Sequence, residues 1–226
     1  MRHVLLKSLS LQAGLFCTNQ SAGTRVSIFR QRKPGEISGA DSGIGRAVAI
    51  AFAKEGSDIL LSYLPEEEPD AAEVVAAIEK AGRTAIKLPG DIRKPEYSQA
   101  LVAAALKEFG RLDIVVNNAG FQMTHDKLED VPLDEVKRTF DTNIFGTFAL
   151  TQVALKELKR GASILNTTSI QAYQPGENLV AYAATKAAVL NMAKSAAKLA
   201  MEQGRTCKCR CTRTSMDAAD SLDDAA

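Results

Sequence analysis

The sequence predicts an α/β fold built on a doubly wound parallel sheet. Strand patterns alternate with helical patterns from Ser38 to Gly204. A glycine-rich loop at residues 38–45 comes directly before one of the helical patterns. Residues 112–116 are apolar apart from Asp113, as expected for a parallel strand that is buried on both faces. We expect the ligand site of such a sheet beyond the carboxyl ends of its strands.

The composition of the 226-residue chain fits one domain with a substantial core, since 46% of its residues are hydrophobic. Lys and Arg number 28 against 27 for Asp and Glu, so no charge excess favours nucleic acid as a partner. No apolar run approaches the roughly 20 residues that cross a bilayer, and we predict no membrane partner. The four cysteines lie in the two end segments, which does not indicate a disulfide framework.

Residues 1–35 form a basic leader with no acidic residue before Glu36. Its serines and apolar residues fit an organellar transit peptide over residues 1–33. The alternative is an unrelated or mis-joined leader without a targeting function, and in that case we expect a cytoplasmic protein. The first strand of the sheet should lie at the end of this leader, which reads Arg-Lys-Pro-Gly-Glu-Ile at 32–37. Proline, glycine and a charge are poor residues for a central strand, so we predict that this strand is damaged or missing.

The glycine-rich loop carries the first candidate ligand residues. Its glycines let the backbone turn tightly and approach a pyrophosphate. The helix that follows, from Ile44 to Lys54, offers its N-terminal amides and the positive end of its dipole to the phosphates. This combination is typical of a Rossmann-like dinucleotide site. The candidate residues are Ser38, Gly39, Asp41, Ser42, Gly43, Ile44 and Gly45.

The end of the second strand, Asp58 to Tyr63, indicates which dinucleotide is bound. An acidic residue at this point binds the ribose hydroxyls of NAD, whereas its absence, with an Arg nearby, accommodates the phosphate of NADP. The position falls near Tyr63, with no acid before Glu66, and Arg46 lies near the ribose side. We therefore predict NADP as the cofactor, with NAD as the alternative.

Two further polar positions follow predicted strands. The alternation continues with a helix at 66–81, a strand at 84–88, a helix at 95–109 and a strand at 112–116. Asp91 follows the third strand, where it is either a ligand residue or a turn or cap residue. The run Asn117-Asn118-Ala119-Gly120 follows the fourth strand.

Residues 132–159 then form one long helix or two in series, with Asn143 at a position where asparagine is mildly unfavourable.

The chemistry depends on the stretch from Ser163 to Ala188, which opens as a strand and continues as a helix from Asn178 to about Gln203. Tyr182 and Lys186 stand at i and i+4 on that helix and share a face, and Ser169 ends the strand. A lysine ammonium one turn from a phenol stabilises the phenolate, so Tyr182 can exchange a proton with a substrate oxygen. The alternative is an ordinary amphipathic helix with a surface Tyr and Lys.

The same stretch, SILNTTSIQAYQPGENLVAYAATKAA, resembles the active site of the short-chain dehydrogenase/reductase family. The segment TTSIQAYQP is similar to the corresponding segment in the glucose/ribitol dehydrogenase-like, general-stress subgroup of that family. The resemblance implies an NAD(P)-dependent oxidoreductase that moves a hydride between the nicotinamide and a carbonyl or alcohol, such as an aldehyde, sugar or polyol. It also implies a homo-oligomer, although the altered ends of this chain put that in doubt.

The resemblance implies roles for individual residues. Tyr182 would exchange the proton, and Lys186 would assist it and bind the nicotinamide ribose. Ser169 would hold the substrate oxygen, and Asn143 would anchor a water that relays protons to the lysine. Further positions implied on the cofactor side are Tyr63, Asp91, Ile92, Asn118, Ala119 and Gly120, and those implied on the substrate side are Ser169, Gln171 and Tyr173.

The resemblance ends near Gly204, so we predict a domain at 36–204 followed by a non-family tail at 205–226, with the last strands missing. Cys207, Cys209 and Cys211 alternate in this tail, but three ligands without a fourth do not make a closed tetrahedral site, and no metal is predicted. A one-base frameshift is our preferred explanation, because one choice of codons for residues 205–219 reads GRASAGAPGPVWTPL in the shifted frame, which contains the family's missing turn. A truncated remnant that binds cofactor weakly or not at all is the alternative function.

Overall fold

The structure is a computed structural model that describes residues 33–212, and within this range six strands form a single parallel sheet. The strand order is β3-β2-β1-β4-β5-β6, so the direction of winding reverses between β1 and β4. The doubly wound α/β fold is thereby confirmed. The strands are β1 (Gly35–Ser38), β2 (Ile59–Tyr63), β3 (Ala85–Pro89), β4 (Ile114–Asn117), β5 (Ser163–Ser169) and β6 (Thr206–Thr212).

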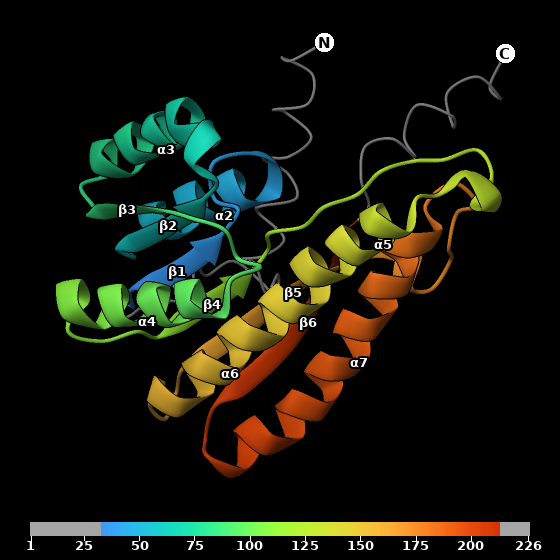
Figure 1. Cartoon of the computed structure of the whole chain (residues 1–226). Helices are drawn as coiled ribbons and strands as arrows, with labels where there is room; N and C mark the ends of the chain where they lie inside the picture. The colour runs from blue at the N-terminus through green and yellow to red at the C-terminus, as the bar shows by residue number, and fades with distance from the viewer. Residues whose placement is uncertain (1–32, 213–226) are drawn as a thin grey trace, which may run out of the picture.

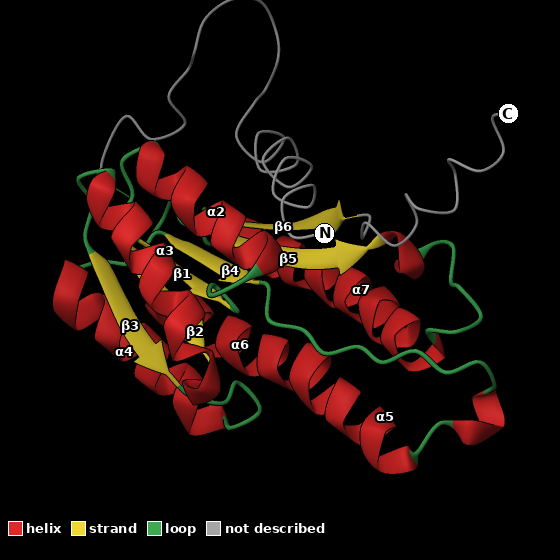
Figure 2. Ribbon diagram, turned by 90° about the horizontal axis from the view of Figure 1, so that it is seen from above, coloured by secondary structure: helices red, strands yellow, loops and turns green. Residues whose placement is uncertain are grey.

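Helices cover both faces of the sheet (Figure 1). One core cluster joins β1, β2 and β4 to α2 (Gly43–Lys54) and α3 (Glu68–Lys80). The cluster on the opposite face contains residues of α4 (Pro95–Phe109), α6 (Thr147–Glu157) and α7 (Val180–Glu202). Figure 2 shows α5 (Leu133–Phe140) lying clear of the sheet. Short 3-10 turns occupy Pro65–Glu67, Leu128–Asp130 and Ile170–Ala172.

The predicted long helix at 132–159 consists of three joined parts. Between α5 and α6 the chain forms a π-helical segment, Asp141–Gly146, and Asn143 lies inside it. A π-helical turn widens the helix locally and is frequent at functional sites. The sequence did not show this segment beyond the unfavourable asparagine.

The prediction of a damaged first strand is wrong. β1 is fully buried and pairs in parallel with β2 on one side and with β4 on the other. Ile37 packs into the core, and a Cβ on Gly35 would make ordinary contact with Ile114, so these two positions suit a central strand. The main-chain ladder depends on amides and carbonyls rather than on side chains, so it tolerates Glu36 in its centre.

The prediction that all strands after residue 204 are missing is also wrong. Thr206–Thr212 forms β6 and pairs in parallel with the whole of β5. Cys207 is buried in the core and its sulfur accepts a hydrogen bond from Asn166, so the alternating pattern of this segment suits a strand. Residues 213–226 and 1–32 lie outside the described part of the chain, and with them the predictions of a transit peptide and of the shifted turn. No helix within residues 33–212 is long and apolar enough to cross a membrane.

Candidate active site

A cleft of about 550 Å³ opens at the carboxyl ends of the strands, where the sheet order reverses. This volume is in the range of ligand pockets. The cleft is lined by most of the predicted cofactor residues, namely Gly39, Asp41, Ser42, Gly43, Ile44, Tyr63, Asp91, Ile92, Asn118, Ala119, Gly120, Tyr182 and Lys186. The other two predicted residues, Ser38 and Gly45, are buried and do not line the cleft.

The glycine-rich loop has the conformation that a phosphate site requires. Gly39 and Gly43 have φ angles of +61° and +53°, which other residues rarely adopt. A Cβ on Gly45 would lie 1.9 Å from the carbonyl oxygen of Gly39, so only glycine lets the helix start this close to the loop. Ser42 stands at the N-cap of α2, yet its side chain caps none of the described helix amides. The first turn of α2 therefore presents amides and a hydroxyl toward the cleft, which suits a pyrophosphate.

Ser38 and Asn118 tie the loop to the centre of the sheet. The Ser38 hydroxyl donates to the carbonyl oxygen of Val116 (3.2 Å) and accepts from the amides of Asn118 (3.0 Å) and Ala119 (3.1 Å). The Asn118 side-chain amide donates to the carbonyl oxygens of Ser38 and Gly39. Ser38 does not line the cleft itself, but its hydroxyl fixes the backbone of Asn118 and Ala119, which do.

Tyr182 and Lys186 are both buried on α7 and both line the cleft. The Lys186 ammonium donates to the carbonyl oxygen of Thr167 at 2.9 Å and lies 5.4 Å from the centroid of the Tyr182 ring. The Thr168 hydroxyl donates to the carbonyl oxygen of Lys186, which fastens α7 to β5. The two residues thus form a close phenol and ammonium pair, as their i, i+4 spacing predicts.

Ser169 ends β5 and is fully buried. Its hydroxyl oxygen accepts a hydrogen bond from the amide of Gln171 at 3.2 Å, so the hydroxyl proton can be donated elsewhere. The side-chain oxygen of Gln171 accepts from the amide of Gly176 at 2.5 Å and closes the turn before α7. Tyr173 is 59% exposed. None of the three predicted substrate residues lines the 550 Å³ cleft.

Asn143 is buried beside the cleft rather than on its wall. Its side-chain oxygen accepts from the amide of Phe121 at 2.7 Å, and its side-chain amide donates to the carbonyl oxygen of Phe121 and to the Thr185 hydroxyl, each at 2.9 Å. A Cβ on Gly120 would lie 3.6 Å from the Asn143 oxygen and 3.7 Å from the Lys186 nitrogen. Asn143 and Lys186 therefore both face Gly120.

Asp91 is held by its neighbour Arg93. The Arg93 guanidinium donates to both carboxylate oxygens, and the Arg93 amide donates to one of them at 2.9 Å. The side-chain hydrogen bond from Arg93 lowers the pKa of Asp91. Asp91 is therefore an oriented acceptor at the cleft wall and also the closing residue of a turn, so both sequence interpretations describe part of its geometry.

Several cleft residues were not predicted from the sequence. Arg138 lies 4.0 Å from the centroid of the Phe121 ring, a cation–π contact at the mouth of the cleft. Arg138 and Thr142 stand at i and i+4, one helical turn apart, and Asn143 could have pointed to that face. The further lining residues that sequence reasoning missed are Ser62, Leu64, Glu67, Gly90, Arg93, Phe121, Gln122, Arg138, Thr142 and Thr167.

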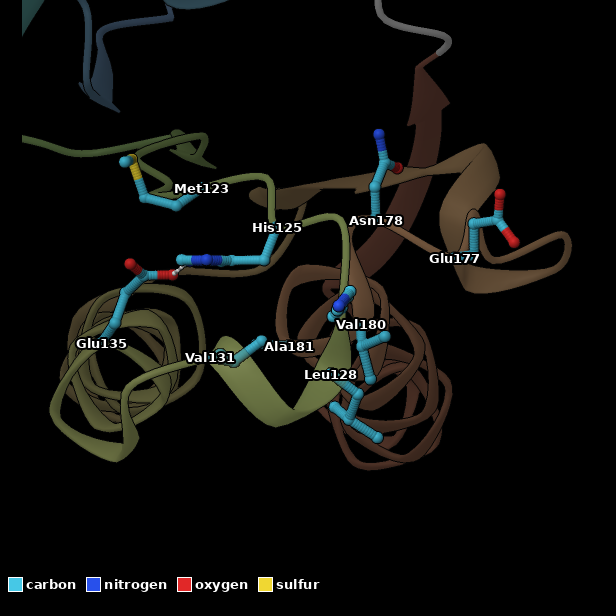
Figure 3. Close-up of a pocket in the computed structure, with 10 residues that line it drawn as sticks. Met123, His125, Leu128, Val131, Glu135, Glu177, Asn178, Val180 and Ala181 are labelled. Carbon is cyan, nitrogen blue, oxygen red and sulfur yellow. Dashed lines mark hydrogen bonds and ion pairs between the residues drawn. The ribbon is translucent and has the colours of Figure 1, made fainter.

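A second pocket, of about 10 Å³, lies between the loop after β4, α5 and the start of α7 (Figure 3). His125 and Glu135 meet in it, with the imidazole Nε2 2.8 Å from the carboxylate. The His125 amide donates to the carbonyl oxygen of Asn178 at 3.1 Å, so the loop is tied to α5 and to the turn that precedes α7. This pocket has room for about one water. No group of three His, Cys, Asp or Glu side chains within residues 33–212 could hold a metal ion.

Comparisons with known proteins show which family the chain resembles. Residues 36–223 match the family model described as short chain dehydrogenase. The oxidoreductase YghA of Escherichia coli is 48% identical over 168 residues, which cover 74% of this chain and 57% of the relative. General stress protein 39 of Bacillus subtilis is 41% identical, with 74% and 58% covered. The chloroplastic NADPH-dependent aldehyde reductase 1 of Arabidopsis thaliana is 38% identical over 173 residues, with 74% and 60% covered.

Solved structures show the same fold. A short chain dehydrogenase from Burkholderia cenocepacia in complex with NADP superposes with a TM-score of 0.75 at 32% identity, over 78% of this chain and 72% of the other. A dehydrogenase/reductase from Sinorhizobium meliloti gives a TM-score of 0.75 at 29% identity, over 78% and 70%. The chain spans less than two thirds of the length of these three curated relatives.

Proposed function

The chain belongs to the short chain dehydrogenase family, and from that premise we propose that it is an NAD(P)-dependent oxidoreductase. It would move a hydride between the nicotinamide and a carbonyl or alcohol, with an aldehyde, sugar or polyol as substrate. The observation that carries this proposal is the pairing of Tyr182 and Lys186 on the wall of a cleft that begins at the glycine-rich loop. The inactive remnant gains no support from the comparisons, which include relatives named as an oxidoreductase and as an aldehyde reductase.

We propose NADP(H) as the first cofactor and NAD(H) as the second. A relative named as NADPH-dependent and a neighbouring structure with NADP support this order. The amides at the start of α2, together with Gly39 and Gly43, would hold the pyrophosphate. Asp91, Ile92, Asn118 and Ala119 would hold the adenosine. When bound, the nicotinamide supplies or accepts the hydride, and side chains of the protein would donate or accept the proton.

Tyr182 would give its phenolic proton to the substrate carbonyl oxygen in reduction and take it back in oxidation. The nearby Lys186 ammonium stabilises the phenolate that remains, and its hydrogen bond to Thr167 keeps it in place. Ser169 would donate its hydroxyl proton to the same substrate oxygen, since its own oxygen already accepts from Gln171. We propose that Asn143 anchors a relay water near Lys186, in keeping with the position of both beside Gly120.

The remaining assignments are also proposals. Gln171 and Tyr173 would contribute to the substrate side, the partner would be a small molecule, and the family's homo-oligomer is the assembly to look for. The domain start at residue 36, the frameshift in the tail and a cytoplasmic location stay predictions, whereas β6 extends the sheet beyond the predicted end at residue 204. The nucleotide sequence encoding residues 205–219 tests the frameshift directly.

Cofactor binding to the purified full chain tests the proposed function. NADPH and NADH should each raise the midpoint of a cooperative thermal melt, because a ligand that binds the folded state stabilises it. A panel of aldehydes and sugars should then oxidise NADPH, followed by the loss of its absorbance. A cooperative melt that neither cofactor shifts would overturn the proposal in favour of the inactive remnant.

A further inference from the structure

The corner of the cleft at the end of β2 contains an acidic side chain that the sequence pattern does not place there. After Tyr63 the chain enters the 3-10 turn Pro65–Glu67, and this turn brings Glu67 back to the cleft wall. One carboxylate oxygen of Glu67 accepts a hydrogen bond from the Leu64 amide at 2.8 Å. The turn and this hydrogen bond hold the carboxylate at the cleft wall beyond the end of β2, the strand end at which such folds recognise the adenosine ribose.

A second carboxylate lies in the same corner. Asp41 lines the cleft from the glycine-rich loop and is buried. The pKa of Glu67 is raised, chiefly by burial and further by the charge of Asp41, although the hydrogen bond from Leu64 lowers it. Both acids line the same cleft.

The cations near this corner are engaged elsewhere. Arg46 forms an ion pair with Glu73 on α3, with 2.9 Å between the charged atoms. Lys87 pairs with Glu68, which also accepts a hydrogen bond from the Tyr63 hydroxyl. Among the described residues that line the cleft, the basic ones are Arg93, Arg138 and Lys186. None of these three lies in the segment between β2 and α3.

The chemistry of the ribose 2′ position distinguishes the two cofactors. NAD(H) carries a hydroxyl there, which donates a hydrogen bond to a carboxylate. NADP(H) carries a phosphate of roughly −1.5 to −2 charge, which a nearby carboxylate repels. A hydrogen bond to a charged group corresponds to roughly a 10-fold or larger change in a dissociation constant.

We propose that Glu67 sets the balance between NAD(H) and NADP(H) in this chain, by accepting from the ribose hydroxyl of NAD(H) and repelling the 2′-phosphate of NADP(H). This inference rests on the proposed function, because it concerns the same cofactor site. In this chain the acid would come from the turn after β2 rather than from the strand end itself.

Glu67→Gln tests the inference, with Glu66→Gln as its matched control. Both changes remove one negative charge from adjacent residues, but Glu66 is exposed and does not line the cleft. A glutamine oxygen can still accept from the Leu64 amide, so the turn is retained. Dissociation constants for NADH and NADPH are measured on the full chain by nicotinamide fluorescence, which reports binding without turnover.

In Glu67→Gln the ratio of the NADPH to the NADH dissociation constant should fall by about 10-fold or more. The ratio should stay within about 2-fold of the original in Glu66→Gln, and Glu67→Ser should change it in the same direction as Glu67→Gln. An unchanged ratio in both Glu67 variants, with folding checked by the melt, would overturn the role of Glu67. An equal change in Glu66→Gln would overturn it as well, because general charge would then explain the effect. If neither cofactor binds the unaltered chain, the proposed function fails and this inference fails with it.

Discussion

The side-chain ammonium of Lys186 donates a hydrogen bond to the main-chain oxygen of Thr167 across the junction of α7 and β5. This 2.9 Å contact fixes the lysine from the strand side, and the centroid of the Tyr182 ring lies 5.4 Å from the same ammonium. Because a main-chain oxygen on a parallel strand has little freedom, the position of the ammonium is determined before any ligand enters. The phenol and the ammonium therefore meet in a fixed geometry.

Removing the ammonium should impair proton exchange far more than cofactor binding. Lys186→Met is expected to lower turnover by about 100-fold or more, which is the scale of general acid–base catalysis. Tyr182→Phe should abolish turnover and still bind NADPH. Steady-state assays and the cofactor-induced melt shift measure the two effects separately. Full activity in the Tyr182→Phe variant would end the proposed mechanism.

Asn143 should be important for stability as well as for turnover. Asn143→Ala leaves the amide and carbonyl of Phe121 without their side-chain partner in the described structure, and such losses cost about 1–3 kcal/mol each. We expect a lower midpoint of urea unfolding and a large loss of turnover. Thr185→Val is the comparison, because it removes one partner of Asn143 but keeps both contacts to Phe121. Equal losses in the two variants would contradict the importance of the Phe121 contacts.

Glu36 should destabilise the fold as pH rises. Its carboxyl is fully buried in β1 and neither oxygen has a hydrogen-bond partner among the described residues, so burial raises its pKa well above 4.5. The folded state then holds a proton that the unfolded state has lost. Stability is therefore highest below about pH 4.5 as far as this group is concerned, and falls by up to about 1.4 kcal/mol per pH unit until the folded pKa is passed.

Glu36→Leu should remove this pH dependence and raise the free energy of unfolding at neutral pH by about 1–3 kcal/mol. Urea unfolding at several pH values measures both changes. Glu66→Gln, an exposed charge removal, should leave the pH slope as it was. A Glu36→Leu variant that is less stable than the original chain at neutral pH would show that the carboxyl has partners in solution.

Gln171 should act as a positioning residue for the turn that joins Ser169 to α7. Gln171→Ala removes the acceptor of the Gly176 amide, so the turn loosens and turnover should fall by about 10-fold or more. Cofactor affinity should be unchanged, because this turn does not line the cofactor cleft. Gln171→Glu retains an acceptor and should recover part of the turnover. If cofactor affinity fell in parallel with turnover, the effect would be a general loss of structure.

Releasing Arg46 should favour NADPH modestly. Glu73→Gln removes its ion-pair partner, whose side chain is 64% exposed, and exposed pairs contribute about 0–1 kcal/mol. The NADPH dissociation constant should therefore fall by no more than about 5-fold, with NADH little changed. Glu79→Gln, an exposed charge removal on the same helix, is the control. Equal effects on both cofactors would mean that Arg46 does not reach the 2′-phosphate.

Local patterns in the sequence predicted the order of the elements and part of the wall of the cleft. Strand and helix periodicity predicted the doubly wound sheet, and the glycine pattern located the loop that lines the cleft at Gly39 and Gly43. The i, i+4 spacing predicted that Tyr182 and Lys186 lie side by side. These features are local, since they follow from the period of a helix, the freedom of a glycine and the end of a strand.

The pairing of β1 and β6 with the sheet, and the contacts between side chains far apart in the sequence, became evident only in the three-dimensional structure. β1 and β6 form because neighbouring strands supply their main-chain partners, a non-local gain that outweighs the poor propensity of Gly35 and Glu36. The turn after β2 returns Glu67 to the cleft, and the Asn143 contacts join residues 22 and 42 positions apart. No sequence period encodes such contacts, because they arise from the packing of elements against one another.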